Sequence, residues 1–392
     1  MSITRQVPIL FVLGCGAGNH GGTGDGGSNN GDGGPPATCT TGLGAWTGAD
    51  NVRASQDPPC GLSPAQVPQF VSIGFDDNGQ VGGMTWAVDM LASRGKASFF
   101  LTSTYAQAAA WRAAHSAGHE IGNHTVSHAT DRNVGSPRWL QEMNDCNAYI
   151  TGTVGVPAAE VIGFRTPFLK YDNDTLSAVK SVGFRYDTSI EEGYEWDDAA
   201  NGGAGGPMDG SNFYWPYTLD NRSPGHTVQV EWGEGLVEIE PHAGLWELPV
   251  YAVVVPPDDK CVQYGVPTGL RAQLKTRQTW FDVEGGLITG FDYNLWAGTS
   301  VGGFAMTKAE FVATLKYTLD QRLAGNRSPY LFGAHTDYYV ASWNPNATGT
   351  PSELDRRAAI EEFLDYARAR PEVELATYAR VLDYVRNPTV QP

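Results

Sequence analysis

Short apolar runs alternate with segments of helical hydrophobic spacing from about residue 70 onward. The apolar runs predict strands at Phe70–Phe75, Ala97–Thr102, Val161–Phe164, Phe184–Thr188, Leu245–Val255 and Tyr330–Gly333. The helical spacing predicts helices at Thr85–Ser93, Ala106–Ser116, Pro137–Ile150, Asn173–Ser181, Thr307–Leu323 and Ser352–Ala369. Because strands that alternate with helices usually form parallel sheets, we predict an α/β fold arranged as a closed or distorted (β/α) barrel.

Two long stretches interrupt this alternation, roughly Glu191–Gly244 and Pro256–Gly303. Both are rich in Gly, Trp, Tyr and Asp. Loops of this length in a compact domain usually have a function. We therefore predict that both are loop insertions over one mouth of the barrel.

Residues 1–14 have the features of a bacterial export signal. Arg5 precedes a short apolar run, Val7–Leu13, which is too short to span a bilayer. The run ends at Val12-Leu13-Gly14-Cys15, which resembles a lipobox and implies lipidation of the Cys15 sulfur. A plain secretory signal or a misplaced start is the alternative. We expect an exported protein, either a cell-envelope lipoprotein held to the membrane only by this anchor or a secreted protein.

Glycine occupies ten of the 23 positions in residues 15–37. No core can form from such a segment, so we predict a flexible tether. Residues 38–69 are predicted to be an N-terminal extension, and residues 70–385 the main folded domain.

Four cysteines remain if Cys15 carries a lipid: Cys39, Cys60, Cys146 and Cys261. An even number in an exported protein suits two disulfides. Pairing of Cys39 with Cys60 is the local choice and leaves Cys146 with Cys261. The alternative is that these cysteines are free and buried.

The charge balance is acidic, with 43 Asp and Glu against 26 Lys and Arg and a net charge of −17. Nucleic-acid binding requires a basic surface, so we expect no nucleic-acid partner. The 11 Trp and 48 Gly are compatible with aromatic loops that stack on sugar rings, although such residues also pack ordinary cores. The sequence does not indicate an oligomeric state.

His124 and His128 are spaced at i and i+4. If the chain is helical there, both imidazoles lie on one face and can bind one metal ion. A second pair, His115 and His119, has the same spacing, but Gly118 is expected to end the helix between them. We predict that this second pair is structural.

Acidic and basic side chains stand at the ends of other predicted strands. Asp76 and Asp77 follow an apolar strand, so one carboxylate can bind metal while the other takes a proton from water; a solvated turn is the alternative. Arg165 precedes Thr166-Pro167, which keeps the chain extended, and its guanidinium can fork onto a carboxylate. His335 ends the last predicted strand and is placed to reach the same mouth.

Together these residues resemble the motifs of the NodB-homology polysaccharide deacetylases, carbohydrate esterase family four. The similar segments are Phe75-Asp76-Asp77, His124–His128, Arg165-Thr166-Pro167-Phe168 and Leu331–His335, and the resemblance extends over about residues 70–380. Two positions differ from the usual pattern, because Asn78 replaces a glycine and Thr166 replaces a proline.

The resemblance implies a distorted NodB-type barrel and a role for each motif residue. Asp77, His124 and His128 are the implied ligands of Zn²⁺, or of another divalent ion such as Co²⁺ or Mn²⁺. The implied catalytic residues are the base Asp76, its partner Arg165 and the acid His335. Asp187 is the candidate carboxylate partner of His335, with Glu247 and Asp337 as rivals. Phe168 and Trp246 are predicted to contact substrate.

The implied activity is metal-dependent removal of acetyl groups from an N-acetylated sugar polymer or oligomer, such as chitin or peptidoglycan, to give acetate and a free amine. The substrate is therefore an acetylated polysaccharide or oligosaccharide. One alternative is hydrolysis of a non-sugar amide on the same fold. Another is a surface lipoprotein that binds carbohydrate without catalysis.

Overall fold

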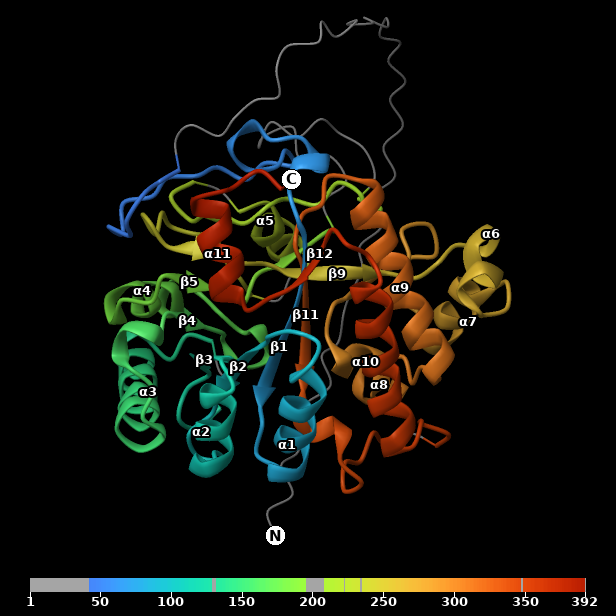
Figure 1. Ribbon diagram of the computed structural model, residues 1–392, viewed down its shortest axis with the longest axis horizontal. Coiled ribbons are helices and arrows are strands. Elements are labelled where there is room, and N and C mark those ends of the chain that lie inside the picture. Colours follow the sequence, from blue (N-terminus) through green and yellow to red (C-terminus); the bar gives the residue numbers. More distant parts are fainter. Residues whose placement is uncertain are drawn as a thin grey trace, which may run out of the picture.

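The computed structural model describes residues 42–128, 132–194, 208–221, 223–232, 235–346 and 348–391. The predictions for the export signal, Cys15 and the Gly-rich tether fall outside these residues. Figure 1 shows an α/β molecule in which helices surround a central sheet.

The described residues contain one large, mostly parallel sheet. Its strands follow the order β11 (Tyr330–His335), β1 (Gln69–Asp77), β2 (Ser98–Leu101), β3 (Glu120–Asn123), β4 (Gly163–Phe164), β5 (Tyr186–Asp187), β8 (Trp246–Glu247) and β7 (Tyr217–Thr218), and β12 (Val373–Leu375) pairs with β1. The β7–β8 pair is antiparallel and the others are parallel. The predicted parallel α/β barrel is confirmed as a curled half-barrel.

A second sheet of three strands lies beside β11. It has the order β10 (Leu287–Thr289), β9 (Val250–Val254) and β6 (Glu191–Glu192). The Gly333 N–H on β11 donates to the carbonyl of Gly290, at 2.8 Å, and so connects the two sheets. The predicted strand Leu245–Val255 is in fact two strands, β8 and β9. Pro249 separates them, because it has no N–H to continue the ladder.

Helices pack around the sheet (Figure 1). Those expected from the hydrophobic spacing are present as α1 (Val81–Leu91), α2 (Ala108–Ser116), α3 (Ser136–Tyr149), α4 (Asn173–Val182), α9 (Lys308–Ala324) and α10 (Glu353–Arg368). Local chemistry sets their ends. Thr307 and Glu310 form a capping box at the start of α9, and Gly183, with φ 95°, ends α4. Helix α11 (Tyr378–Arg386) was not predicted, and it packs against β1.

The two interrupting stretches contain regular elements, so their prediction as loops was partly wrong. They hold β6, β7, β10, α5 (Pro224–Glu231), α6 (Asp258–Cys261), α7 (Leu270–Arg277) and α8 (Asp292–Trp296). Helices α6 and α7 lie at the outer edge of the molecule beside α9 (Figure 1). Helix α8 lies beside β11, where it reaches the site described below.

The predicted disulfide between Cys146 and Cys261 is wrong. Both cysteines are buried and free. Cys146 lies on α3 and Cys261 on α6, and these helices stand on opposite sides of the molecule (Figure 1). Cys60 is in a disulfide, whereas Cys39, its predicted partner, lies outside the described residues.

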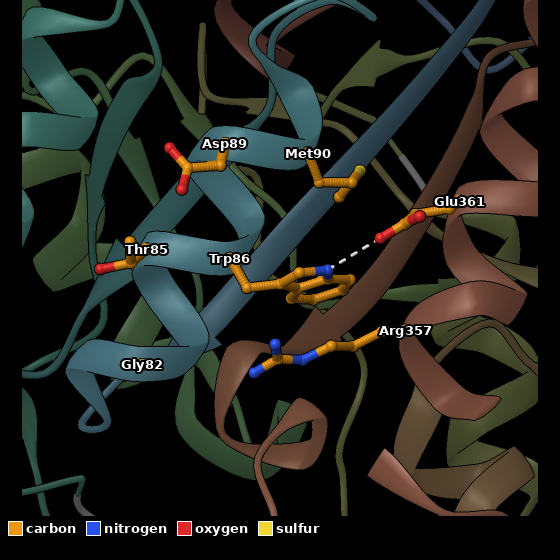
Figure 2. Close-up of a pocket in the computed structure, with 7 residues that line it drawn as sticks. All are labelled: Gly82, Thr85, Trp86, Asp89, Met90, Arg357 and Glu361. Atoms are coloured by element: carbon orange, nitrogen blue, oxygen red, sulfur yellow. Dashed lines mark hydrogen bonds between the residues drawn. The ribbon is translucent and has the colours of Figure 1, made fainter. Parts of the chain in front are cut away.

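A surface hollow of about 600 Å³ lies between α1 and α10 (Figure 2). It is lined by Gly82, Thr85, Trp86, Asp89, Met90, Arg357 and Glu361. The Trp86 indole N–H donates to Glu361 at 3.0 Å, and the indole ring stacks on Tyr339 with centroids 4.7 Å apart. Trp86 therefore ties α1 to α10 and to the segment that follows β11.

Among the described residues, no helix combines the length and the apolar character needed to cross a bilayer.

Candidate active site

The predicted site residues gather where the parallel strands end. Asp76 and Asp77 close β1, His124 follows β3, Arg165 follows β4 and His335 closes β11. Carboxyl ends of neighbouring parallel strands meet at one edge of a sheet, so side chains that are far apart in sequence converge there.

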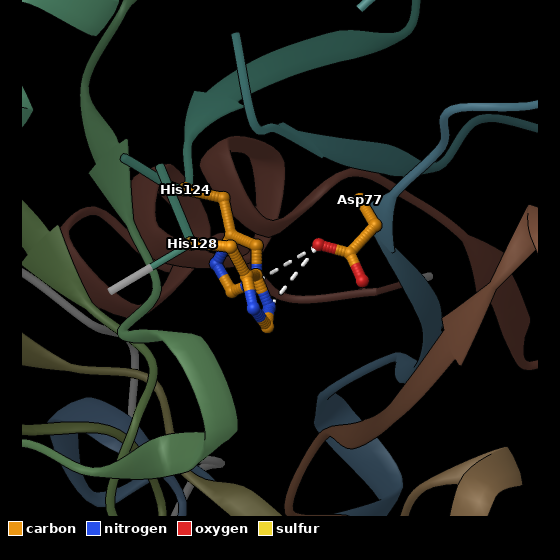
Figure 3. Close-up of side chains that lie close together, drawn as sticks. All are labelled: Asp77, His124 and His128. Atoms are coloured by element: carbon orange, nitrogen blue, oxygen red, sulfur yellow. Dashed lines mark ion pairs between the residues drawn. The ribbon is translucent and has the colours of Figure 1, made fainter. Parts of the chain in front are cut away.

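Asp77, His124 and His128 form a three-residue cluster whose ligand atoms all lie within 4.8 Å of one another. The Asp77 Oδ1 atom is 3.2 Å from His128 Nε2 and 3.7 Å from His124 Nε2 (Figure 3). The Nδ1 of His124 lies 2.7 Å from the carbonyl of Arg165. Because a carbonyl only accepts, this bond places the ring proton on Nδ1 and leaves the Nε2 lone pair facing Asp77.

The electrostatics of this cluster favour metal binding. Burial lowers the pKa of His128 to about 4 and also lowers that of His124, so both imidazoles are neutral near pH 7. Burial raises the pKa of Asp77, and a cation would oppose that shift. Two imidazole nitrogens and one carboxylate oxygen suit Zn²⁺, with positions left for water and substrate, and Co²⁺ or Mn²⁺ accepts the same donors.

The histidine pair lies on a loop, so the predicted helical turn is wrong although the pairing is right. Thr125 and His128 have φ values of 71° and 54°, in the left-handed region. The hydroxyl of Thr125 accepts from the His128 N–H at 3.1 Å. The buried carboxylate of Glu142 accepts the N–H groups of Val126 and Ser127, each at 2.9 Å. These bonds fix the loop that carries both histidines.

Asp76 is paired with a fully buried arginine. Arg165 Nη1 donates to Asp76 Oδ1 at 2.7 Å, and its Nη2 donates to the hydroxyl of Tyr378 at 2.9 Å. We predicted that both guanidinium nitrogens of Arg165 would bond to the carboxylate, but only Nη1 does so, and Nη2 bonds to Tyr378 instead. Burial opposes the charge of Arg165, yet Asp76 and Tyr378 raise its pKa above the usual value. Gly74 leaves room for the guanidinium, since a Cβ there would lie 2.9 Å from both Nη atoms.

His335 is paired with Asp292, so the prediction of Asp187 as its partner is wrong. The His335 Nδ1 lies 2.8 Å from Asp292 Oδ1, and the His335 N–H donates to Asp292 Oδ2 at 2.9 Å. Burial alone would lower the pKa of His335, but the charge and hydrogen bond of Asp292 outweigh burial and raise it to about 9. His335 is therefore protonated at neutral pH.

The rival carboxylates have other partners. Asp187 accepts from the hydroxyl of Ser189 at 2.9 Å, and burial raises its pKa to about 6. Glu247 accepts from the Ile190 N–H at 3.1 Å. Asp337 accepts from the backbone N–H groups of residues 79 and 80, at 3.0 and 2.8 Å, just before α1.

A local repeat in the sequence could have revealed Asp292. Gly74-Phe75-Asp76 ends at the residue paired with Arg165, and Gly290-Phe291-Asp292 repeats the same three residues. In both places the aspartate follows a short apolar run. The second copy lies in a stretch that we predicted to be a loop, so Asp292 was not predicted as a site residue.

Comparisons with known proteins place the first three motifs in one family. The model of the polysaccharide deacetylase family matches residues 65–186. Over these residues the chain belongs to the polysaccharide deacetylase family. This agrees with the resemblance drawn from the residues.

The chain is similar to two curated deacetylases of Bombyx mori. Chitin deacetylase 8 is 22% identical over 352 residues, which cover 86% of this chain and 75% of that protein. Chitin deacetylase 1 is 26% identical over 145 residues, covering 34% of this chain and 27% of that protein. A crystal structure from Mycobacterium smegmatis, described as a polysaccharide deacetylase, superposes with a TM-score of 0.51 at 16% identity and covers 87% and 97% of the two chains. That likeness supports the fold.

Two departures from the deacetylase pattern have structural roles here. Asn78 has φ 56°, a conformation that asparagine tolerates, and its amide donates to the Phe75 carbonyl at 2.9 Å. Its Oδ1 accepts from the Thr336 N–H at 3.3 Å, which links β1 to the segment after His335. The N–H of Thr166 donates to Ser189 Oγ at 2.9 Å, a bond that proline could not make.

The two predicted substrate contacts differ in this deacetylase fold. Phe168 is 49% exposed, and its ring lies edge-on to His128 with centroids 4.5 Å apart. Trp246 is fully buried, and its indole donates to Asp50 at 2.8 Å. Phe168 is therefore accessible beside the cluster and its role stays a prediction, whereas the prediction for Trp246 is wrong because its side chain belongs to the core.

The second histidine pair has the structural roles that we predicted. His115 pairs with Glu160 at 2.8 Å on the surface. His119 is buried, and its Nδ1 accepts from the Ala97 N–H at 3.2 Å.

Proposed function

We propose that this chain is a metal-dependent deacetylase acting on an N-acetylated sugar polymer or oligomer, to give acetate and a free amine. One observation carries the proposal. An arginine-held carboxylate, Asp76, and an aspartate-held histidine, His335, lie on neighbouring strands beside the Asp77–His124–His128 cluster. Metal-dependent amide hydrolysis uses this combination of base, acid and electrophile.

A divalent ion held by Asp77, His124 and His128 would polarise the acetamide carbonyl and lower the pKa of a water molecule. Asp76, with Arg165 beside it, takes the proton of that water as it attacks the carbonyl carbon. Arg165 also orients the carboxylate, because its guanidinium is fixed by Tyr378 and by the ring of Phe100, 4.4 Å away.

His335 supplies the second proton transfer. The amine of an amide is a poor leaving group unless it is protonated as the carbon–nitrogen bond breaks. Asp292 keeps His335 protonated and holds its Nδ1, so Nε2 is the atom that donates to the nitrogen. Phe168 stands exposed beside His128, where a sugar ring would pass.

The two Bombyx mori relatives are named as chitin deacetylases, which supports a chitin-like substrate built from N-acetylglucosamine. Peptidoglycan carries the same acetamide and belongs to the same proposal. Zn²⁺ is the proposed ion. We also propose that the protein is exported and anchored through a lipid on Cys15.

Acetate release from a panel of acetylated substrates, with and without added Zn²⁺, tests this function. The panel contains chitooligosaccharides, peptidoglycan fragments and small non-sugar acetamides. We expect zinc-dependent acetate from at least one glycan, and its loss in Asp76→Asn. Acetate from the small amides alone would favour the non-sugar alternative. Glycan binding without acetate from any substrate would mean that the protein is a carbohydrate-binding module.

A further inference from the structure

Three planar side-chain groups stack one after another on the imidazole of His335. The ring of Tyr338 stacks on the imidazole with centroids 4.3 Å apart and planes 19° apart. Trp343 stacks on Tyr338 at 4.5 Å and 20°. The guanidinium of Arg356 lies over Trp343, 4.8 Å from the ring centroid. We call His335, Tyr338, Trp343 and Arg356 the His335 column.

Arg356 anchors the far end of the column to α10. Its side chain is almost fully buried, and it donates to the carbonyls of Tyr338 at 2.6 Å and Val340 at 3.1 Å, and also to that of Pro351. One arginine therefore both covers Trp343 and holds the backbone from which Tyr338 projects.

Neighbouring residues fix the same segment from other directions. Tyr339 stacks on Trp86 of α1 and accepts from the Trp296 indole N–H at 3.3 Å. Asp337 bonds to the backbone just before α1. Tyr338 thus stands between two anchored residues and has little freedom to move away from His335.

Asp292 alone does not fix the plane of the His335 ring. Its carboxylate holds the Nδ1 edge of the ring and the backbone N–H, but a ring held at one edge can still tilt about that bond. A second ring parallel to the imidazole and in van der Waals contact with its face prevents the tilt. The π face of the Tyr338 ring also stabilises the imidazolium form of His335.

We propose that Tyr338 is a positioning residue for the general acid His335, and that Trp343 and Arg356 hold Tyr338 in place. This inference rests on the proposed function, in which His335 protonates the leaving amine. A tilt of the ring would move Nε2–H off the line to the amide nitrogen, and proton transfer is sensitive to such misalignment.

The leaving group separates positioning from general structural damage. An amine needs a proton in order to leave, whereas the phenolate of an aryl acetate leaves without one. A misaligned His335 imidazole therefore slows hydrolysis of the N-acetyl group but leaves hydrolysis of the aryl ester unchanged. General damage to the metal cluster or to Asp76 slows both reactions.

The experiment compares kcat and KM on an N-acetylated chitooligosaccharide and on an aryl acetate, using zinc-loaded full-length protein. Tyr338→Leu should lower kcat on the glycan by about tenfold or more, with KM and zinc content unchanged, and change aryl ester hydrolysis by less than about twofold. Tyr338→Phe should keep the glycan rate of the parent protein, because phenylalanine retains the ring that stacks on the imidazole. Trp343→Leu should show the same selectivity with a smaller loss, and it tests the proposal if Tyr338→Leu fails to fold.

Two further variants calibrate the result. His335→Ala must show the same selective loss, only larger. Tyr366→Leu is a matched control, because Tyr366 also lies under an arginine, Arg370 at 3.6 Å, but outside the column. It should leave both rates unchanged.

The possible failures are distinguishable. If the parent releases acetate from neither substrate, the proposed function fails, and this inference fails with it. If His335→Ala is selective but Tyr338→Leu matches the parent, or loses both activities equally, the inference alone is overturned.

Discussion

Asp76 and His335 are paired in register on the adjacent parallel strands β1 and β11. The two groups therefore leave the sheet at the same level, each with its own buried counter-ion. Asp76 is held by a cation, Arg165, and His335 by an anion, Asp292. Arg165 orients Asp76 as the proposed base, and Asp292 raises the pKa of His335 and orients it as the proposed acid, so the two groups stand in register but are positioned by separate partners.

Asp76→Asn should abolish the base while keeping the metal. We expect turnover to fall by about 10²–10⁴-fold, the usual contribution of a general base, with zinc content unchanged. Stability should also fall by about 3 kcal/mol, because Arg165 would be left as a buried charge without its carboxylate. Steady-state kinetics, metal analysis and urea denaturation measure these effects. Near-parent turnover would show that the base is another group.

His128→Ala should remove both the ion and the activity, because the cluster seen among the described residues has three protein ligands and loses one of them. His115→Ala is the matched control: His115 has a surface carboxylate partner and should keep full zinc content. Equilibrium dialysis followed by metal analysis separates the two variants. Stoichiometric zinc in His128→Ala would show that the ligand assignment is wrong.

Activity should fall as the pH rises through the pKa of His335, since the protonated form is the acid. That pKa is raised to about 9, and a cation near Asp77 opposes protonation, so the falling limb should lie at or below pH 9. Asp292→Asn removes the anion that favours the imidazolium, so the limb should move to lower pH. Asp187→Asn should leave it in place, because Asp187 bonds to Ser189. A limb that moves with Asp187 and not with Asp292 contradicts the pairing.

Cys15→Ser should release the protein from membranes as a folded, soluble form. The predicted tether after it has no apolar anchor of its own. Fractionation of cells that express the parent and the variant measures the change. Equal membrane association of both would exclude lipidation at Cys15.

The parts of the site that lie at the ends of long apolar strands were predictable. Asp76 and His335 end β1 and β11, two of the longest strands, and hydrophobic runs of this length are easily recognised in a sequence. Asp292 follows a strand of only three residues and opens a helix of five. Neither element is long enough to show a period, so the counter-ion of the acid was missed.

Other predictions failed because sequence spacing does not measure distance in space. His124 and His128 do converge, but two left-handed residues in a loop bring them together rather than a helical turn. The pairing of Cys146 with Cys261 followed from elimination, and elimination says nothing about which side of the molecule each helix occupies. Trp246 lies on a strand next to a buried carboxylate, and only tertiary packing shows that its ring faces the core.

The bonds that Glu142 makes to the histidine loop have a consequence for metal selectivity. The Glu142 carboxylate accepts from the N–H groups of Val126 and Ser127 and from the Ser127 hydroxyl, so these bonds within the protein hold the unfavourable left-handed conformation of the loop. An arriving ion therefore meets ligands that are already arranged and does not have to order them. A rigid site of this kind discriminates by coordination radius and geometry, and exchange of one divalent ion for another should proceed without partial unfolding of the chain.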